Sequence, residues 1–126
     1  MVKFAVIAGS ASKDLGKRIA RRLKAPYVEA KTRVFPDGES KITFGLIPKN
    51  SVVLVVQSTY PPVDTNLLQA LSIISQARKA SSKIYAVIPY IGYARQDKQF
   101  LSGEVVTMSI VAKMLQTAGA KKNYCC

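Results

Sequence analysis

The sequence predicts an α/β fold, in which a mostly parallel sheet carries helices on both faces. Short apolar runs rich in Val and Ile recur along the chain, as is typical of strands buried on both faces. Longer stretches with helical periodicity separate these runs, which is the pattern of βα units joined by right-handed crossovers. The length of 126 residues fits one domain.

The first predicted strand covers residues 3–8, and residues 12–24 follow it as an amphipathic helix. Ser12 has a suitable side chain to cap this helix. One helix face is apolar and should be buried, whereas the other is basic and fits either a solvated face or an anion-binding face. The apolar positions are Leu15, Ile19 and Leu23, and the basic ones are Lys13, Lys17, Arg18, Arg21, Arg22 and Lys24.

The middle of the chain predicts two short strands, at residues 27–34 and 41–45, and a central strand at residues 52–56. Asp64 is placed to cap a helix that runs to about Ala80. The positions of this helix that we expect to face inward are Leu67, Leu68, Leu71, Ile74 and Ala77.

The last third predicts a strand at residues 84–88 and, after a long loop, a helix over residues 102–118 that stops at Gly119. Its expected buried positions are Val105, Met108, Ala112 and Leu115. Another apolar strand should follow, but the chain becomes polar instead. We therefore expect a domain over residues 1–120 and an atypical polar tail over residues 121–126. Either the domain ends with this helix or the chain is a piece of a longer protein, and the pattern alone does not decide between them.

The amino-acid composition limits the kinds of partner that the protein could bind and the cellular compartment that we expect for it. Nineteen Lys and Arg against seven Asp and Glu give a net charge of +12, which favours anionic partners. The absence of His removes the commonest general base and the commonest nitrogen ligand for metals. The adjacent Cys125 and Cys126 fit neither a zinc pattern nor a disulfide framework. With no apolar run of transmembrane length and no signal peptide, we expect a cytoplasmic protein without a membrane partner.

Ligands of parallel α/β sheets bind beyond the carboxyl ends of the strands, so the loops after residues 8, 56 and 88 are the places to look. The stretch from Gly9 to Lys17 lacks the spacing of a Walker motif and the Ser or Thr that follows its Lys. Gly92 stands alone, without a dinucleotide-binding fingerprint. Neither glycine-rich motif is therefore present.

Two loops carry side chains suited to a nucleotide. In the first, Phe35 can stack on a purine, Asp37 and Glu39 can accept from an exocyclic amine, and Gly38 permits a tight turn. In the second, the long loop 89–101, Arg95 offers a planar fork for phosphate, with Gln96 and Lys98 beside it. A plain hairpin turn and a solvated surface loop are the respective alternatives. The segment 57–60 adds hydroxyls and an amide at the same edge.

In their order and spacing these segments resemble one family, ribose-phosphate pyrophosphokinase, which is also called phosphoribosyl-diphosphate synthetase. The matching stretches are Phe35-Pro36-Asp37-Gly38-Glu39, then Gln57-Ser58-Thr59 with Asn66-Leu67, and the highly specific run Val87-Ile88-Pro89-Tyr90-Ile91-Gly92-Tyr93-Ala94-Arg95-Gln96-Asp97. The resemblance covers residues 3–120. It implies a phosphoribosyltransferase-like domain, the first of two in the family.

The resemblance implies a transferase of nucleotide biosynthesis that moves the β,γ-diphosphoryl group of ATP to the C1 hydroxyl of ribose 5-phosphate, with Mg2+. It further implies that Phe35 stacks on adenine while Asp37 and Glu39 bond its amino group. In the family this loop reaches the ATP site of a neighbouring subunit, which implies a homo-oligomer. Arg95 and Gln96 would contact ATP, and Asp97 would support their loop.

Other parts of the family pattern are missing from the sequence. The family's next strand carries an Asp and a His, and its second domain supplies the transition-state Lys and Arg and the loop that holds ribose 5-phosphate. We therefore expect no catalytic residue and no metal ligand within this chain, and little or no turnover by it alone. One alternative is a non-catalytic regulatory or oligomerisation module of such a synthetase. An RNA-binding domain is disfavoured, because the basic helix lacks interleaved aromatic residues.

Overall fold

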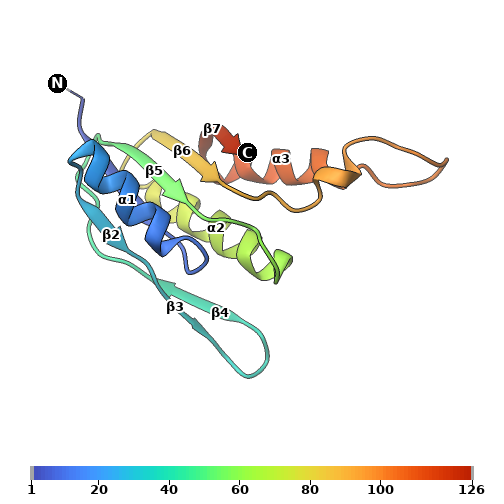
Figure 1. Cartoon of the computed structure of the whole chain (residues 1–126), viewed down its shortest axis with the longest axis horizontal. Coiled ribbons are helices and arrows are strands. Elements are labelled where there is room, and N and C mark those ends of the chain that lie inside the picture. Colours follow the sequence, from blue (N-terminus) through green and yellow to red (C-terminus); the bar gives the residue numbers. More distant parts are fainter. Residues whose placement is uncertain (1, 126) are drawn as a thin grey trace.

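Residues 2–125 are described by a computed structural model, which contains a large sheet, a separate hairpin and three α-helices (Figure 1). In chain order the elements are β1 (Phe4–Ala8), α1 (Lys13–Leu23), β2 (Tyr27–Glu29), β3 (Lys31–Val34), β4 (Ser40–Thr43), β5 (Val52–Val56), α2 (Val63–Ala77), β6 (Lys83–Ile88), the 3-10 helix η1 (Ala94–Gln96), α3 (Thr107–Ala118) and β7 (Ala120–Cys125). None of the helices in this range is long and apolar enough to cross a membrane.

The large sheet has five strands in the order β2-β1-β5-β6-β7, and all neighbouring strands are parallel. The chain first runs from β1 through α1 to β2. It then returns to β5 on the other side of β1 and continues in that direction through β6 to β7. Because such crossovers are right-handed, the reversal puts α1 on one face and α2 with α3 on the other. The predicted fold class is therefore confirmed.

Alternate residues of the central strands supply the two apolar layers. On one face Val6 and Val56 lie in a small cluster with Ala20 of α1. On the other face Ile7 and Val55 belong to the main core. The helical side of that core includes Ile73, Ile74, Val111 and Leu115, each no more than 1% exposed. The strands predicted at residues 3–8, 52–56 and 84–88 are confirmed, with shifts of at most one residue at their ends.

Helix α1 lies so close to the sheet that small residues form its buried face. Gly16 and Ala20 are buried, whereas Leu15 and Leu23 are 37% and 39% exposed. A Cβ atom on Gly16 would lie 2.5 Å from the Cβ of Ala8, so the close approach requires glycine there. The expectation that Leu15 and Leu23 face the core is therefore wrong, although Ile19 does pack against the sheet.

The two helices on the other face also depart from the sequence prediction. Pro62 is the N-cap residue of α2, so Asp64 lies within the first turn and does not cap the helix. Leu68 is 59% exposed, because the buried face of this helix includes Asn66 and Gln69 instead. Helix α3 begins at Thr107 rather than near residue 102, and its buried residues are Val111 and Leu115. Val105 and Ala112, which were expected to be buried, are exposed.

The single strand predicted at residues 27–34 divides into β2 and β3, which belong to different sheets and are separated by the buried Ala30. Strand β3 pairs with β4 in an antiparallel hairpin, in which Arg33 lies opposite Lys41. Figure 1 shows this hairpin extending away from the large sheet, with the turn at the end of the hairpin that lies away from the sheet. Ile42 and Phe44 at its base pack against the main core.

The expectation that the strand-helix pattern fails after Gly119 is wrong. Residues Ala120–Cys125 form β7, which pairs in parallel with β6 and closes one edge of the sheet. A register shift lies between Ile84 and Tyr85, and from there the pairing continues to Ile88 opposite Cys125. The predicted tail thus forms a strand as far as Cys125, while Cys126 lies outside the described residues.

Candidate functional site

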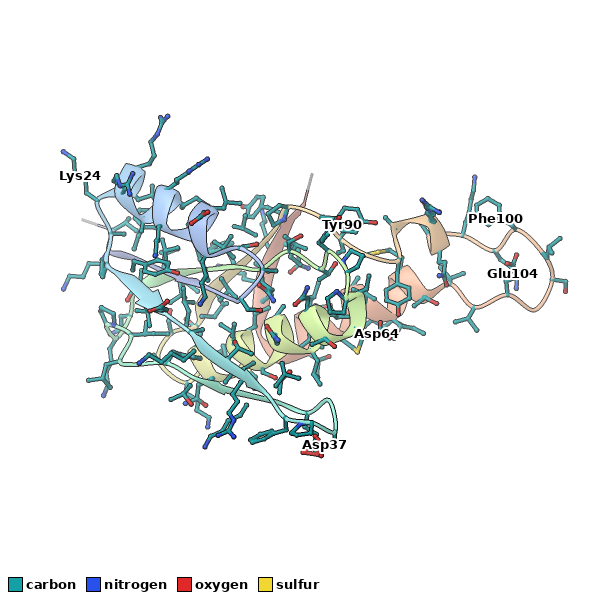
Figure 2. The ribbon with its side chains drawn as sticks, turned by 60° about the horizontal axis from the view of Figure 1, so that its bottom comes forward. Lys24, Asp37, Asp64, Tyr90, Phe100 and Glu104 are labelled. Atoms are coloured by element: carbon teal, nitrogen blue, oxygen red, sulfur yellow. The ribbon has the colours of Figure 1, made fainter. Side chains whose placement is uncertain are left out.

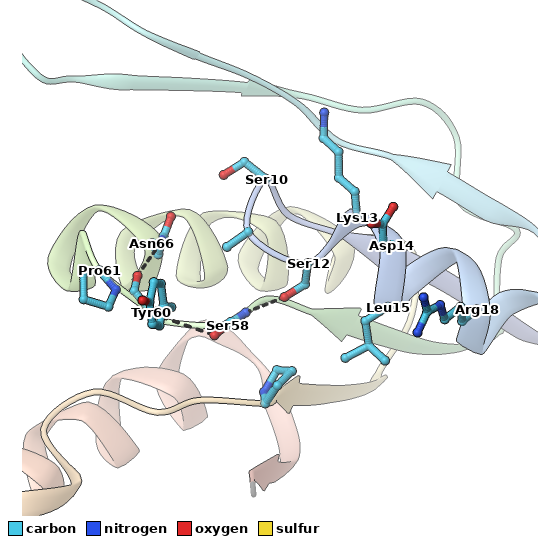
Figure 3. Close-up of a pocket in the computed structure, with 12 residues that line it drawn as sticks. Ser10, Ser12, Lys13, Asp14, Leu15, Arg18, Ser58, Tyr60, Pro61 and Asn66 are labelled. Carbon is cyan, nitrogen blue, oxygen red and sulfur yellow. Dashed lines mark hydrogen bonds between the residues drawn. The ribbon is translucent and has the colours of Figure 1, made fainter.

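The strand order reverses between β1 and β5, and an open cleft of about 800 Å³ lies at the carboxyl ends of these two strands (Figure 3). Such switch points are where parallel α/β sheets bind ligands. The cleft is lined about equally by polar and apolar surface. Its polar groups are hydroxyls, an amide and two cations, with a single carboxylate. These side chains belong to Ser10, Ser12, Ser58, Tyr60, Asn66, Lys13, Arg18 and Asp14.

A buried amide network fixes the floor of the cleft. Gln57 follows β5, is fully buried, and accepts a hydrogen bond of 3.0 Å from the backbone N–H of Ala11. Its amide nitrogen donates to Oε1 of Gln69 at 3.2 Å, and the hydroxyl of Ser10 donates to the same oxygen at 2.7 Å. Gly9 makes this arrangement possible, because a Cβ there would lie 2.4 Å from Oε1 of Gln57. The loop after β1 is thus tied to both β5 and α2.

The Ser12 hydroxyl belongs to the same framework rather than to a helix cap. It accepts a hydrogen bond of 2.9 Å from the backbone N–H of Ser58, drawn as a dashed line in Figure 3. Helix α1 consequently has no side-chain cap. Ser12 does occupy the N-cap position as predicted, but its side chain does not cap the helix, because the end of β5 offers a competing donor that no local pattern reveals.

Thr59 anchors the loop that follows β6. Its buried hydroxyl donates to the backbone oxygen of Tyr90 at 3.0 Å and accepts from the backbone N–H of Gly92 at 2.6 Å. Next along the loop, the Tyr93 hydroxyl donates to Asp64, and this hydrogen bond raises the pKa of Tyr93 above its usual value. These contacts hold the base of the segment that presents Arg95.

The second set of predicted ATP-site residues lies on and just after η1. Arg95, Gln96 and Asp97 are all exposed. The side-chain oxygen of Gln96 accepts a hydrogen bond of 2.8 Å from the Thr107 hydroxyl at the start of α3. This hydrogen bond joins η1 to the start of α3, at the two ends of the loop 97–106. Figure 1 shows this loop projecting from the molecule.

The predicted adenine loop forms the turn of the β3–β4 hairpin. Backbone hydrogen bonds of 2.8 Å run from Phe35 N–H to the oxygen of Glu39 and from Gly38 N–H to the oxygen of Phe35. Gly38 has φ +94, in the left-handed region that its lack of a Cβ permits. One oxygen of Asp37 accepts from the backbone N–H of Glu39 at 3.0 Å, so only its other oxygen is free of the turn.

The structure groups the six predicted site residues into two sets that do not meet. Phe35, Asp37 and Glu39 lie together at the hairpin tip, where Asp37 is labelled in Figure 2. Arg95, Gln96 and Asp97 lie on or just after η1, which leads into the loop that carries Phe100 and Glu104, away from the hairpin tip (Figure 2). The two sets therefore come from separate parts of the fold, and no hydrogen bond or ion pair of the described residues joins them.

The described residues offer few carboxylates that could hold magnesium. Over residues 2–125, no group of three or more His, Cys, Asp or Glu side chains lies close enough together to hold a metal ion. The cleft offers the lone carboxylate of Asp14, and Asp64 already accepts from Tyr93. Strand β7 is the strand that was expected to be missing, but its residues include neither Asp nor His.

The sequence indicated several residues of this cleft without indicating that they meet. Lys13 and Arg18 belong to the basic helix face, and Asn66 belongs to a stretch that resembles the family. Ser10, Lys13 and Arg18 come from the loop after β1 and the start of α1, and Asn66 comes from α2. For Ser10 the only signal was positional, since the loop after residue 8 follows a buried strand. The hydrogen bonds that bring these segments together join residues 46 to 59 positions apart.

These features define a parallel α/β domain that presents polar loops at the carboxyl edge of its sheet. Residues 4–119 match a family described as the N-terminal domain of ribose phosphate pyrophosphokinase. The chain belongs to this family.

Individual relatives agree with this assignment. A ribose-phosphate pyrophosphokinase of Methanobrevibacter smithii is 43% identical over 117 residues, which cover 91% of this chain and 39% of that protein. The crystal structure of phosphoribosylpyrophosphate synthetase from Mycobacterium smegmatis has a TM-score of 0.88 at 30% identity, over 98% of this chain and 42% of the other. The chain thus spans about two fifths of the length of these relatives.

A more distant structure shares only the fold. The APRTase of Giardia lamblia, solved in complex with 9-deazaadenine, has a TM-score of 0.58 at 15% identity. That alignment covers 98% of this chain and 68% of the APRTase. The fold is therefore of the kind that the sequence predicted, and the synthetase family is the more specific assignment.

Proposed function

We propose that this chain is the ATP-facing amino-terminal domain of a ribose-phosphate diphosphokinase. In the reaction of such an enzyme, the C1 hydroxyl oxygen of ribose 5-phosphate attacks the β-phosphorus of ATP. The bond between the α,β-bridging oxygen and the β-phosphorus breaks, and AMP leaves while the hydroxyl proton is lost. Phosphoryl transfer of this kind depends mainly on positioning and on charge neutralisation.

The observation that carries the proposal is the exposed hairpin tip with one aromatic ring and two carboxylates, held away from the chain's own Arg95. A ring is suited to stack on adenine, and a carboxylate oxygen is suited to accept from its amino group. Arg95 presents a planar fork for phosphate from η1. We infer that the hairpin of one copy and η1 of another contact the same ATP, so the working unit is a homo-oligomer.

The chain carries the nucleotide-binding part of this function rather than the chemical step. We propose no catalytic residue within it, because the six candidate residues bind and orient ATP. The described side chains include no cluster of three or more metal-ligating groups, so we assign no step of the transfer to a metal held by this chain. We place the domain in the cytoplasm, in keeping with its lack of a disulfide framework.

Mixing of variant chains tests the shared site. Phe35→Leu removes the stacking ring and should weaken ATP binding at least about fivefold, since base stacking on an aromatic residue contributes roughly 1–3 kcal/mol. Arg95→Gln should weaken it through the phosphate. In a mixture of the two variants, each mixed dimer keeps one intact site made from the unaltered hairpin and the unaltered Arg95. About a quarter of all sites should then recover.

Isothermal titration with ATP, on each variant and on the equimolar mixture, gives the fraction of sites recovered. No recovery in the mixture, with binding by the unaltered chain, would mean that both loops do not serve one shared site. Association with a full-length synthetase without any ATP binding would favour the non-catalytic module instead. In an assay of AMP release with ribose 5-phosphate, turnover of about 1–100 per second by this chain alone would contradict its inactivity.

A further inference from the structure

The ring of Phe35 has a cation on one of its faces. The guanidinium carbon of Arg33 lies 5.0 Å from the centroid of the Phe35 ring. The two residues are two positions apart at the end of β3, and this spacing places their side chains on the same side of an extended chain. The contact is therefore built by the strand itself and does not depend on a bound ligand.

Charge around Arg33 points to the ring as its specific partner. Directly across the hairpin from Arg33 is another cation, Lys41. Among the residues that the structure describes, the one ion pair joins Lys13 and Glu29, far from this tip. The carboxylates of Asp37 and Glu39 thus leave Arg33 unpaired, although both lie in the same turn. The guanidinium is held against the ring instead.

We infer that Arg33 is a positioning residue for purine binding, acting through Phe35. Its guanidinium covers one face of the ring and restricts the ring's rotation, which leaves the opposite face for a purine. The inference rests on the proposed function, since it assumes that Phe35 stacks on the base of a nucleotide. A purine that stacks on this ring then approaches from one side, with the carboxylates of the turn beside it.

The expected size of the effect is small but measurable. A cation–π contact at an exposed site corresponds to roughly a two- to fivefold change in an equilibrium constant. Arg33→Gln should therefore weaken ATP binding about two- to fivefold, while Arg33→Lys, which keeps a cation over the ring, should lose less. The Arg33 side chain is exposed and the Phe35 ring is half-buried at the hairpin tip, so these variants of Arg33 test binding and not folding.

Lys41→Gln is the matched control, because it removes one positive charge from the residue directly opposite without touching the ring. A double-mutant cycle with Phe35→Leu separates positioning from a direct phosphate contact. If Arg33 acts through the ring, Arg33→Gln has no further effect once Phe35 is Leu. If it binds phosphate, its effect is the same in both backgrounds.

The experiment titrates ATP and, separately, inorganic tripolyphosphate into these variants at one ionic strength. The inference predicts a loss with Arg33→Gln for ATP, no loss for tripolyphosphate, and a change of less than about 1.5-fold for Lys41→Gln. Additive effects in the cycle, an equal loss with Lys41→Gln, or a loss of tripolyphosphate binding would overturn it. If Phe35→Leu weakens ATP binding and Arg33→Gln does not, the inference fails while the proposed function stands. If neither has an effect, both fail.

Discussion

Gly9→Ala should destabilise the domain because of a single buried side chain. A Cβ at this position would lie 2.4 Å from Oε1 and 2.5 Å from Cδ of Gln57, well inside contact distance. Gln57 is fully buried and its oxygen receives the N–H of Ala11, so it has no free space into which to withdraw. The added methyl group must therefore break the network or push the loop after β1 away from β5.

The cost follows from the bonds that would be lost. Displacing Gln57 breaks its bonds of 3.0 Å from Ala11 N–H and 3.2 Å to Gln69. A buried polar group left without a partner costs about 1–3 kcal/mol, so we expect a total loss of about 2–4 kcal/mol. The whole domain should have a stability of roughly 6–19 kcal/mol, so the variant is expected to fold and to be measurably weakened.

Urea unfolding gives the free energy of unfolding for the unaltered chain and for the variant. Gly45→Ala is the control, because a methyl group added there would have no other atom within 4 Å and its φ is ordinary. That control should stay within about 0.5 kcal/mol of the unaltered chain. Gln57→Ala supplies a second test: in its background Gly9→Ala should cost less than about 0.5 kcal/mol, since the clash is gone.

A loss for Gly9→Ala no larger than that of Gly45→Ala would refute the steric reasoning. A full loss that persists when Gln57 is Ala would refute the assignment to Gln57. That second result would place the strain in the backbone of the loop instead.

Three further predictions concern other contacts. Thr59→Val removes a buried hydroxyl that serves both Tyr90 and Gly92, and should cost about 1.5–3 kcal/mol in urea unfolding. The pKa of Tyr93 is raised by its hydrogen bond to Asp64, so Asp64→Ala should lower it in an absorbance titration read against Tyr93→Phe. A raised folded pKa means that this contact stabilises the fold below the unfolded tyrosine pKa and is lost as pH rises through the folded one. Finally, alternate amides of β7 should be protected in hydrogen exchange, and uniformly fast exchange would exclude that strand.

The central strands could be predicted because each is a short, nearly continuous run of apolar residues, which is typical of a parallel strand buried on both faces. The α1 interface could not, because the helical pattern there places Leu15 and Leu23 where large apolar residues normally face inward. The structure instead brings Gly16 and Ala20 against the sheet, since a close approach to Ala8 excludes larger side chains. Hydrophobic periodicity therefore predicts that a helix forms, but it does not predict how closely that helix approaches the sheet.

Strand β7 was missed for a related reason. Edge strands are solvated along one side, and Lys121, Lys122 and Asn123 are all exposed, so the segment resembles a polar tail. Its strand conformation comes from pairing with β6, and tertiary pairing of this kind overrides local propensity.

In the candidate site, too, the features built from neighbouring residues could be predicted, whereas those built from distant segments could not. A turn needs only neighbouring residues, so Phe35, Asp37 and Glu39 lie in one hairpin loop as their spacing predicted. The cleft depends on segments 46 to 59 residues apart, and no local pattern encodes their meeting. Local prediction could therefore supply the parts of a nucleotide site without their arrangement. The family resemblance already implies that the hairpin serves a neighbouring copy, and the place of the hairpin tip away from η1 in three dimensions is in keeping with the proposed shared site.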